Sequence, residues 1–343
     1  MSNNIELIFR DNMQEYIDKI KKSNPNAIFL SHSKLGTFAQ CPRSYYYSYI
    51  DRKPQTTGVY STLGSEVHDT LQELYEDKTD VLNKSKFDKA FEMCELLGVE
   101  FPQSQYDIAG NYKKDIDNFY KNYQRIPKED GRRFICELGF ILQIDENHYE
   151  MGYIDLLILN PDGTAEIVDF KTSSTFSGSH LIEAGRQLIL YKLAIEQLYN
   201  IPVTRVSWQM VKYIDVQIGN NKPKIGLKGR DWVKACSSQI KTLLKKELGD
   251  EMVAEIMLLK AVAENSIESL PQNVQDKIRY NIQDREYKVT QDLIDEFWEY
   301  TRNSIKAIES KEQTIDNFEC KCDDFFCRWL CGFSRDYCNE WKK

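Results

Sequence analysis

The segment from residue 134 to residue 171 constrains the fold most, because it has the pattern of three consecutive strands. The runs "FICELGFILQI" and "YEMGYIDLLIL" are mainly apolar, and "AEIVDFK" follows them after a short turn. Strands joined by short turns pair as antiparallel hairpins, and their apolar faces must be covered by other elements. We therefore expect a central sheet in an α/β fold.

The turn "NPDGT", residues 160–164, predicts the register of the last hairpin. Its proline suits the first central position of a type I turn, its aspartate the second, and its glycine the left-handed position that completes a three-residue loop. Asn160 then pairs with Thr164. Counting outward from this pair sets Asp155 opposite Asp169, with β-carbons roughly 4.5 to 5.5 Å apart.

Two facing carboxylates destabilise a sheet unless something compensates their charge. Lys171 projects from the same face as Asp169, because side chains alternate along a strand. A divalent cation is the natural compensation, since Mg²⁺ binds to carboxylates, waters and phosphate oxygens. Lys171 could then activate a water molecule or stabilise charge on a phosphate. The alternative is a surface ion pair between Asp169 and Lys171, but the apolar neighbours favour a half-buried site.

Helical patterns surround the strands. Ser31 is a candidate helix cap, and Cys41-Pro42 divides the following segment into two short helices. A further helix is expected to open near Gly64. The other predicted elements are helices over 84–124, 182–199 and much of 230–310, and a strand over 205–214.

We expect one domain over 1–343, because no repeat or low-complexity linker interrupts the chain. Its predicted parts are N-terminal helices (30–80), a helical insertion (84–130), an α/β core (131–215), a helical region (230–310) and a cysteine-rich segment (318–343).

The net charge of −8 argues against a protein that is coated in nucleic acid, although it does not exclude a local basic groove. The stretch from Lys222 to Lys246 is rich in lysine and is either such a groove or a solvated helix face. No apolar run reaches the roughly 20 residues of a membrane span, and the first residues lack the pattern of a signal peptide. We expect a cytoplasmic protein without membrane contact, and bacterial or phage-infected cells as its setting.

Nine cysteines in a reducing compartment are not expected to form disulfides. Cys94, Cys136 and Cys236 stand alone in apolar or helical contexts, which is typical of small buried side chains. The other cysteines near the C-terminus are dense enough to suggest a ligand cluster: Cys320, Cys322, Cys327, Cys331 and Cys338.

In their order, these features resemble the PD-(D/E)XK nuclease superfamily, in the branch of RecB-type, AddB-type and CRISPR-associated adaptation nucleases. "LSHSKLGTFAQCPRSYYYSYI" is similar to the opening segment of that branch, "GYIDLL" to its first-acid strand, "IVDFKT" to its acid-x-lysine strand and "RQLILY" to its glutamine-containing helix. The resemblance spans about residues 30 to 338. It implies a restriction-endonuclease-like mixed sheet flanked by helices.

The resemblance also implies roles for individual residues. Asp155 and Asp169 would bind Mg²⁺ or Mn²⁺, with His68 as a further ligand. A histidine beside the apolar stripe of its helix is otherwise more often a core residue. Gln187 and Tyr191, four residues apart on one helix face, would orient the site. Glu137, on the strand before the hairpin, is a further candidate carboxylate.

Some members of the branch hold a [4Fe-4S] cluster with one N-terminal and three C-terminal cysteines. Cys41 matches the first position. Cys327, Cys331 and Cys338 match the other three, with each gap one residue wider than usual, so Cys320 or Cys322 could replace one of them. Four thiolates would also suit Zn²⁺.

We therefore predict a metal-dependent DNA nuclease, most simply an exonuclease that acts on DNA ends or single strands in recombination, repair or phage DNA processing. No P-loop sequence occurs, so any unwinding would need a helicase or recombination partner. Tyr45, Tyr46, Tyr47 and Tyr49 could stack bases, although at least two are expected in the core. The alternatives are a non-catalytic DNA-binding module with the same fold and a CRISPR-adaptation processing factor.

Overall fold

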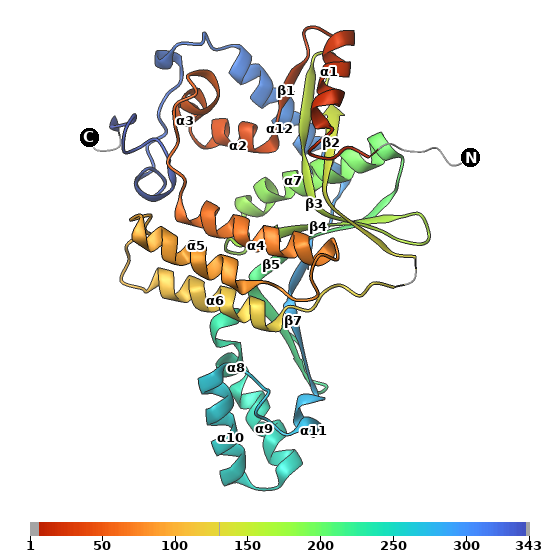
Figure 1. Cartoon of the computed structure of the whole chain (residues 1–343), viewed down its shortest axis with the longest axis vertical. Helices are drawn as coiled ribbons and strands as arrows, with labels where there is room; N and C mark the ends of the chain where they lie inside the picture. Colours follow the sequence, from red (N-terminus) through yellow and green to blue (C-terminus); the bar gives the residue numbers. More distant parts are fainter. Residues whose placement is uncertain (1–6, 130, 341–343) are drawn as a thin grey trace.

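The computed structural model describes residues 7–129 and 131–340, and within these ranges seven strands form one mixed sheet (Figure 1). The strand order is β1-β3-β4-β5-β6, with β2 paired to β3 and β7 paired to β5. The strands are β1 (Ile28–Leu30), β2 (Arg133–Gln143), β3 (His148–Leu159), β4 (Ala165–Lys171), β5 (Val203–Ile218), β6 (Lys224–Lys228) and β7 (Ile278–Glu286). The expected central sheet of an α/β fold is confirmed.

Twelve α-helices accompany the sheet in the described residues. They are α1 (Met13–Ser23), α2 (His32–Gln40), α3 (Pro42–Tyr45), α4 (Val59–Tyr75), α5 (Lys84–Leu96), α6 (Ile108–Asn122), α7 (Ser179–Tyr199), α8 (Trp232–Ala235), α9 (Ser237–Leu248), α10 (Glu251–Glu264), α11 (Gln272–Gln275) and α12 (Gln291–Glu309). None of the described helices is long and apolar enough to cross a membrane.

The helices cover the two faces of the sheet with separate cores. Helices α7 and α12 close one face, where Leu188 and Phe297 pack with Ile167 of β4. Helices α4, α5 and α6 close the other, where Phe87 and Phe119 pack with Val168. The segment 84–124 is helical in α5 and α6, as expected, but not between them at 97–107. The two helices bury an aromatic face against the sheet although their composition is polar.

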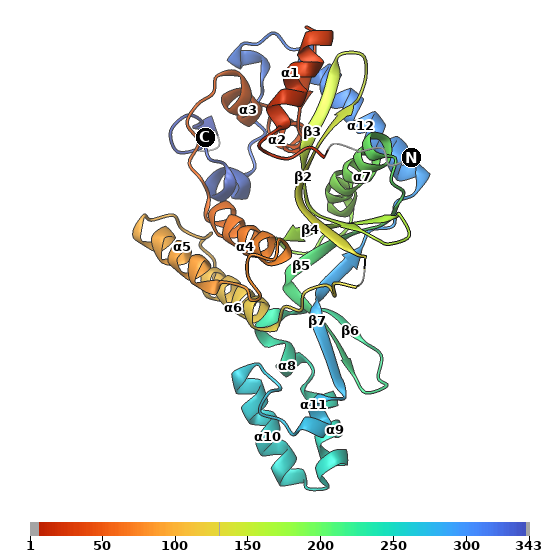
Figure 2. The same cartoon turned by 45° about the vertical axis from the view of Figure 1, so that its right-hand side comes forward.

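A lobe built from α8, α9, α10 and α11 extends beyond the end of β5 and the start of β7, which lie side by side (Figures 1 and 2). It has a hydrophobic core of its own, in which Trp232 and Leu244 pack with Ile218 at the end of β5. Part of the lysine-rich stretch lies here, and three of its basic residues form ion pairs: Lys245 with Glu251, Lys241 with Glu255 and Arg230 with Asp115. These three pairs favour the solvated-surface interpretation for that part of the stretch.

The predicted hairpin register is confirmed. Asn160 donates its backbone N–H to the carbonyl of Thr164 at 2.9 Å, and Gly163 has φ +85°. The ladder continues through Leu159 with Ala165 to Leu156 with Val168.

Two predicted elements differ from the structure. Helix α4 begins at Val59, five residues before the expected start at Gly64. Strand β7 lies inside the segment that was predicted as helical. Its sequence "IRYNIQDRE" carries few apolar residues because much of the strand is exposed, and it is defined by pairing with the distant β5.

Candidate active site and cysteine cluster

The β3-β4 ladder ends at Leu156 with Val168, and the two predicted acids follow directly after it. There Oδ2 of Asp155 accepts the backbone N–H of Phe170 at 2.8 Å. A carboxylate thus replaces a backbone carbonyl as the partner of this N–H. The carboxylate of Asp155 therefore lies between β3 and β4, next to the position of Asp169.

The side-chain alternation of β2 and β3 reverses at the level of Asp155. In β2, Cys136 packs toward α4 whereas Leu138 packs toward α7, and Glu137 between them has φ +50°. In β3, Leu156 packs toward α4 whereas Ile154 packs toward α7. This reversal lets the carboxylate of Asp155 reach both the β4 backbone and helix α4.

Asp169, Lys171, Gln187 and Tyr191 form a continuous chain of polar contacts. Lys171 Nζ lies 2.6 Å from Oδ2 of Asp169 and donates to Oε1 of Gln187 at 2.8 Å. Gln187 Nε2 donates to the hydroxyl of Tyr191 at 2.7 Å. Helix α7 thus presents both of its predicted residues to the end of β4.

His68 reaches the same place from α4. Its Nδ1 lies 3.4 Å from Oδ2 of Asp155, and its ring packs edge-on against Phe170. Gly64, one turn earlier, allows α4 to approach, because a β-carbon there would lie only 3.2 Å from the hydroxyl of Thr172. Glu137 instead points to Arg10, whose guanidinium lies 2.7 Å from its carboxylate.

Burial and the mutual charges of the site residues shift their pKa values. Burial, and next the charge of Asp169, raise the pKa of Asp155 to about 7. Burial alone would lower the pKa of Lys171, but the charges of Asp169 and Asp155 outweigh it and raise that pKa. Lys171 is therefore an ammonium group at neutral pH. Two carboxylates and an imidazole are donors that suit Mg²⁺ or Mn²⁺. Within the described residues, the ligand atoms of Asp155, Asp169 and His68 do not all lie close enough together to hold one ion without movement of a side chain.

One buried acid was not anticipated from the sequence. Glu150 on β3 is fully buried, and neither of its carboxylate oxygens has a hydrogen-bond partner. Its Oε1 lies 3.9 Å from Nδ1 of His32. Burial raises the pKa of Glu150 to about 8 and lowers that of His32 to about 4, so both groups are neutral near pH 7. In the sequence, Glu150 resembles any polar position of an alternating strand.

The C-terminal segment folds back onto the first helices. Arg43 donates from Nε to the carbonyl of Phe318 at 2.6 Å and forms an ion pair with Glu340 at 2.9 Å. Phe318 packs against Phe38 and Tyr45. Cys41, at the start of α3, is thereby brought to the same part of the molecule as the C-terminal cysteines.

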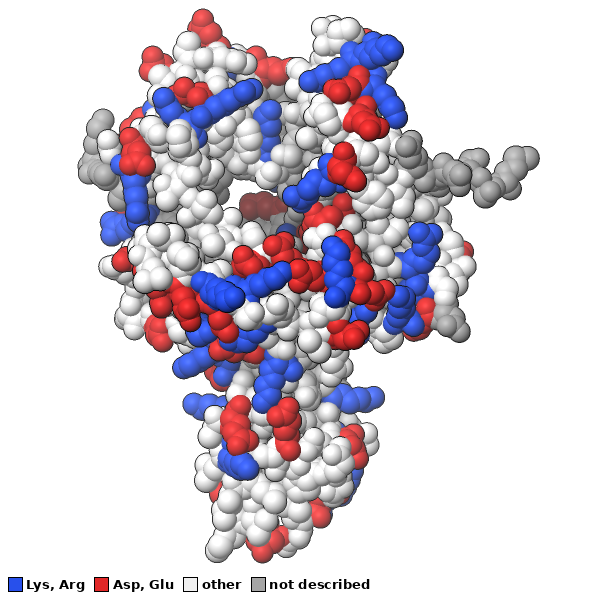
Figure 3. Space-filling view, in the orientation of Figure 1, with Lys and Arg blue, Asp and Glu red and all other residues white. Residues whose placement is uncertain are grey.

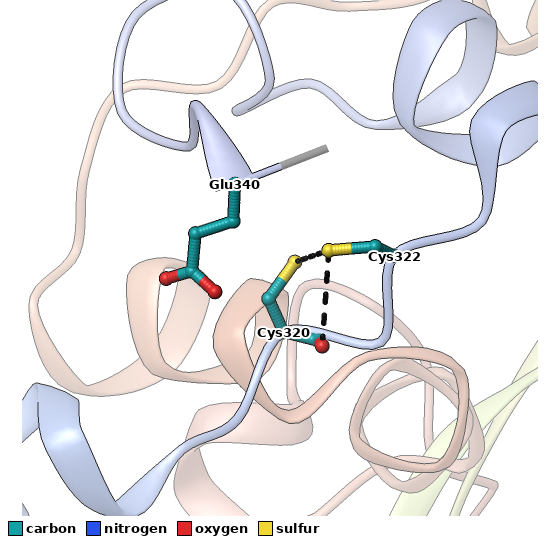
Figure 4. Close-up of side chains that lie close together, drawn as sticks. All are labelled: Cys320, Cys322 and Glu340. Carbon is teal, nitrogen blue, oxygen red and sulfur yellow. Dashed lines mark hydrogen bonds between the residues drawn. The ribbon is translucent and has the colours of Figure 1, made fainter. Parts of the chain in front are cut away.

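The thiols that lie closest together include Cys320 and Cys322, which the sequence offers only as replacements for one of the three C-terminal ligands. The Sγ atom of Cys320 lies 3.3 Å from that of Cys322 and 3.6 Å from that of Cys338. Figure 4 shows Cys320 and Cys322 beside Glu340, whose carboxylate completes a possible three-ligand group. Cys331 packs against the same hydrophobic cluster as Cys320 and Cys338, and its Sγ lies 3.6 Å from the hydroxyl of Ser44. Cys327 is buried, as are the three isolated cysteines, Cys94, Cys136 and Cys236.

The tyrosines of the opening segment divide between core and surface. Tyr45 and Tyr47 are buried, so at least two belong to the core as expected, whereas Tyr49 is 37% exposed.

The family model described as the PD-(D/E)XK nuclease superfamily matches residues 29–335. The matched region contains both acids, the lysine and the histidine of the site, and it ends before Cys338. No curated protein matches the sequence.

Proposed function

Because the chain belongs to the PD-(D/E)XK nuclease superfamily, we propose that it is a metal-dependent deoxyribonuclease that hydrolyses phosphodiester bonds. The observation that carries this proposal is the convergence of Asp155, Asp169 and Lys171 at the point where β3 and β4 separate. His68, from helix α4, lies 3.4 Å from Oδ2 of Asp155 and would supply a nitrogen ligand beside it.

Asp155, Asp169 and His68 would hold Mg²⁺ or Mn²⁺. When bound, such an ion lowers the pKa of a coordinated water and neutralises charge on the phosphate. Lys171 would stabilise negative charge on the scissile phosphate. The raised pKa of Lys171 supports this role over that of a base, because an ammonium group has no free electron pair to accept a proton. Gln187 and Tyr191 would orient the ammonium group.

We further propose an exonuclease that acts on DNA ends or single strands, in recombination, repair or phage DNA processing. The side chains of Asp155 and Asp169 are only 15% and 2% exposed. Figure 3 shows a hollow in the surface directly above the position of α4, and acidic side chains lie at the bottom of this hollow. A free end or a single strand reaches a recessed site more easily than the middle of a duplex does. A role in CRISPR adaptation, with a partner, is the alternative setting.

The test is cleavage of end-labelled single-stranded, linear duplex and circular DNA with Mg²⁺. We expect Asp169→Ala and Lys171→Ala each to lower the rate by about 10²–10³-fold. Asp80→Ala, which removes an exposed acid far from β4 in sequence, is the matched control and should leave the rate unchanged. Digestion of linear but not circular DNA would support the exonuclease. Equal rates for all variants, or DNA binding without cleavage, would contradict the enzyme assignment.

For the cysteines, we propose a [4Fe-4S] cluster held by Cys41 and three C-terminal thiolates, with Zn²⁺ as the competing occupant. Cys41 and the five C-terminal cysteines lie in the region where the C-terminal segment packs against residues 38–47. Thiolates are the ligands both metals prefer. The short distances from Cys320 to Cys322 and Cys338 favour Cys320 as a ligand in place of Cys327 or Cys331. Visible absorption and metal content of anaerobically purified protein would distinguish iron-sulfur from zinc. Cys320→Ser and Cys331→Ser would identify the ligand.

A further inference from the structure

Helix α10 has apolar residues on two opposite sides, but only one of these sides is covered. Its inner side packs in the core of the lobe through Ala254, Leu258 and Ala261. Its outer side carries a row of exposed residues that we call the α10 stripe: Met252, Ile256, Leu259 and Ala263. The three large ones are 74%, 61% and 60% exposed. Large apolar side chains in a continuous row are normally buried, and within the described residues nothing covers this stripe.

The stripe is continuous. Its residues follow one another at intervals of four, three and four, which keeps them on one line along the helix. This is the spacing of residues that pack into the holes of a second helix. Val253, beside the stripe, is 39% exposed and widens it.

The charges around the stripe are already compensated within the chain. On the side of α9, Glu251 pairs with Lys245 and Glu255 pairs with Lys241. On the other side, Lys260 lies 3.9 Å from Glu264. A nucleic acid or an anionic membrane surface needs uncompensated basic residues at its binding site. The surface of the lobe in Figure 3 accordingly shows wide uncharged areas.

We propose that the α10 stripe is covered by the same stripe of a second copy of this chain, in an antiparallel helix pair. In this pairing Met252 lies across from Ala263 of the second copy, and Ile256 lies across from Leu259 of the second copy. Each large side chain thus meets a small or medium one, and the two-fold symmetry repeats both contacts. Lys260 lies toward Val253 of the second copy, so no like charges meet.

The shape of the molecule favours the antiparallel arrangement. The lobe is narrower than the body, and α10 runs roughly along the long axis of the molecule (Figures 1 and 2). Antiparallel helices place the two wide bodies at opposite ends of the dimer. Parallel helices would bring the bodies against each other.

The test is the molar mass of the full chain by sedimentation equilibrium over a range of concentrations. One helix pair is at the low end of stable interface sizes, so we expect a dimer that dissociates in the micromolar range, on the order of 1–100 μM. Ile256→Asp should raise the dissociation constant by about 30-fold or more, as expected for a central apolar residue. The matched control is Leu96→Asp on α5, where an 80% exposed leucine is replaced outside the lobe, and it should leave the constant unchanged.

A mixing experiment distinguishes the two orientations. Ile256→Asp and Leu259→Lys should each weaken self-association. When these two variants are mixed, an antiparallel pair sets the new aspartate against the new lysine and leaves the second contact apolar, so heterodimers should form in preference to either homodimer. Circular dichroism of each variant verifies its fold, and Met252→Asp replaces any variant that fails this control.

Three outcomes would overturn the proposal. The first is a wild-type chain that is still monomeric at a concentration of about 100 μM. The second is a dimer that Ile256→Asp leaves intact or that Leu96→Asp weakens equally. The third is a dimer whose mixed variants show no preference, which would contradict the antiparallel register.

Discussion

At the scale of single residues, Lys171 is fixed by partners on two sides. Asp169 holds its ammonium group by charge, and the side-chain oxygen of Gln187 accepts from it. Gln187 in turn donates through its nitrogen to Tyr191, so the amide group has only one orientation that serves both neighbours. We infer that Gln187 positions the ammonium group, and that its effect on catalysis acts through Lys171.

Substitution of Gln187 should therefore reduce turnover more than substrate binding. We expect Gln187→Ala to lower kcat by about 10- to 100-fold with little change in KM, because a displaced lysine loses alignment with the phosphate. Gln187→Glu keeps an oxygen that accepts from Lys171 and should restore part of the rate. Steady-state kinetics on single-stranded DNA measures this. A loss that appears only in KM would indicate that Gln187 binds DNA directly.

Glu150 should make the stability of the protein depend on pH. Its pKa is 4.5 when exposed and about 8 in the folded chain, so the folded state binds more protons between these values. The contribution of Glu150 to the free energy of unfolding should fall as the pH rises from about 5 to 8, by up to about 5 kcal/mol. The lowered pKa of His32 acts in the opposite sense between about pH 4 and 6.5, so the comparison with a Glu150 variant isolates the effect. Glu150→Gln removes this contribution. Urea unfolding of both proteins at pH 5 and pH 8 measures the difference, and the same slope in both would contradict the assignment.

At the scale of secondary-structure elements, local signals were readable and long-range ones were not. The turn at 160–164 determines the hairpin register through the backbone preferences of proline and glycine, and Ser31 caps α2 by accepting from Lys34. Strand β7 was missed because its strand conformation depends on β5, about 70 residues earlier, and not on an apolar pattern of its own.

The geometry of the candidate site likewise has a part that follows from local sequence signals and a part that depends on long-range contacts. The opposition of Asp155 and Asp169 follows from the turn. Their relation to His68 does not, because it needs both the close approach of α4 at Gly64 and the reversal of alternation at Glu137. Glu150 could not be identified, since only the folded chain shows that nothing bonds to its carboxylate.

The approach of α4 gives a prediction for Gly64. A β-carbon there would lie 3.2 Å from the Thr172 hydroxyl, so Gly64→Val should push the helix and His68 away from the sheet. We expect a loss of about 1–3 kcal/mol in stability and lower nuclease activity. Gly36→Ala in α2 is the matched control, because its new methyl group meets nothing within 4 Å and should stabilise the helix by about 0.5–1 kcal/mol. Thermal unfolding and DNA cleavage of both variants test the contrast.

At the scale of the whole molecule, the C-terminal segment packs against residues 38–47 and closes one side of the structure. Arg43 binds Phe318 and Glu340, and Tyr47 packs with Phe333 and donates to the carbonyl of Tyr337. The cysteines lie at this junction. A metal bound there therefore links segments that are nearly 300 residues apart, and its binding free energy adds to the folding free energy.

This linkage predicts that one cysteine substitution acts only while metal is present. Cys338→Ser should lower the metal content and the free energy of unfolding of the protein as purified. Cys94→Ser, at an equally buried but isolated thiol, should change stability without changing the metal content. After a chelator has removed the metal, wild type and Cys338→Ser should unfold at nearly the same denaturant concentration, because the thiolate then has no ligand role. A stability gap that survives metal removal would mean that Cys338 contributes by packing against Tyr47 and Phe333 instead.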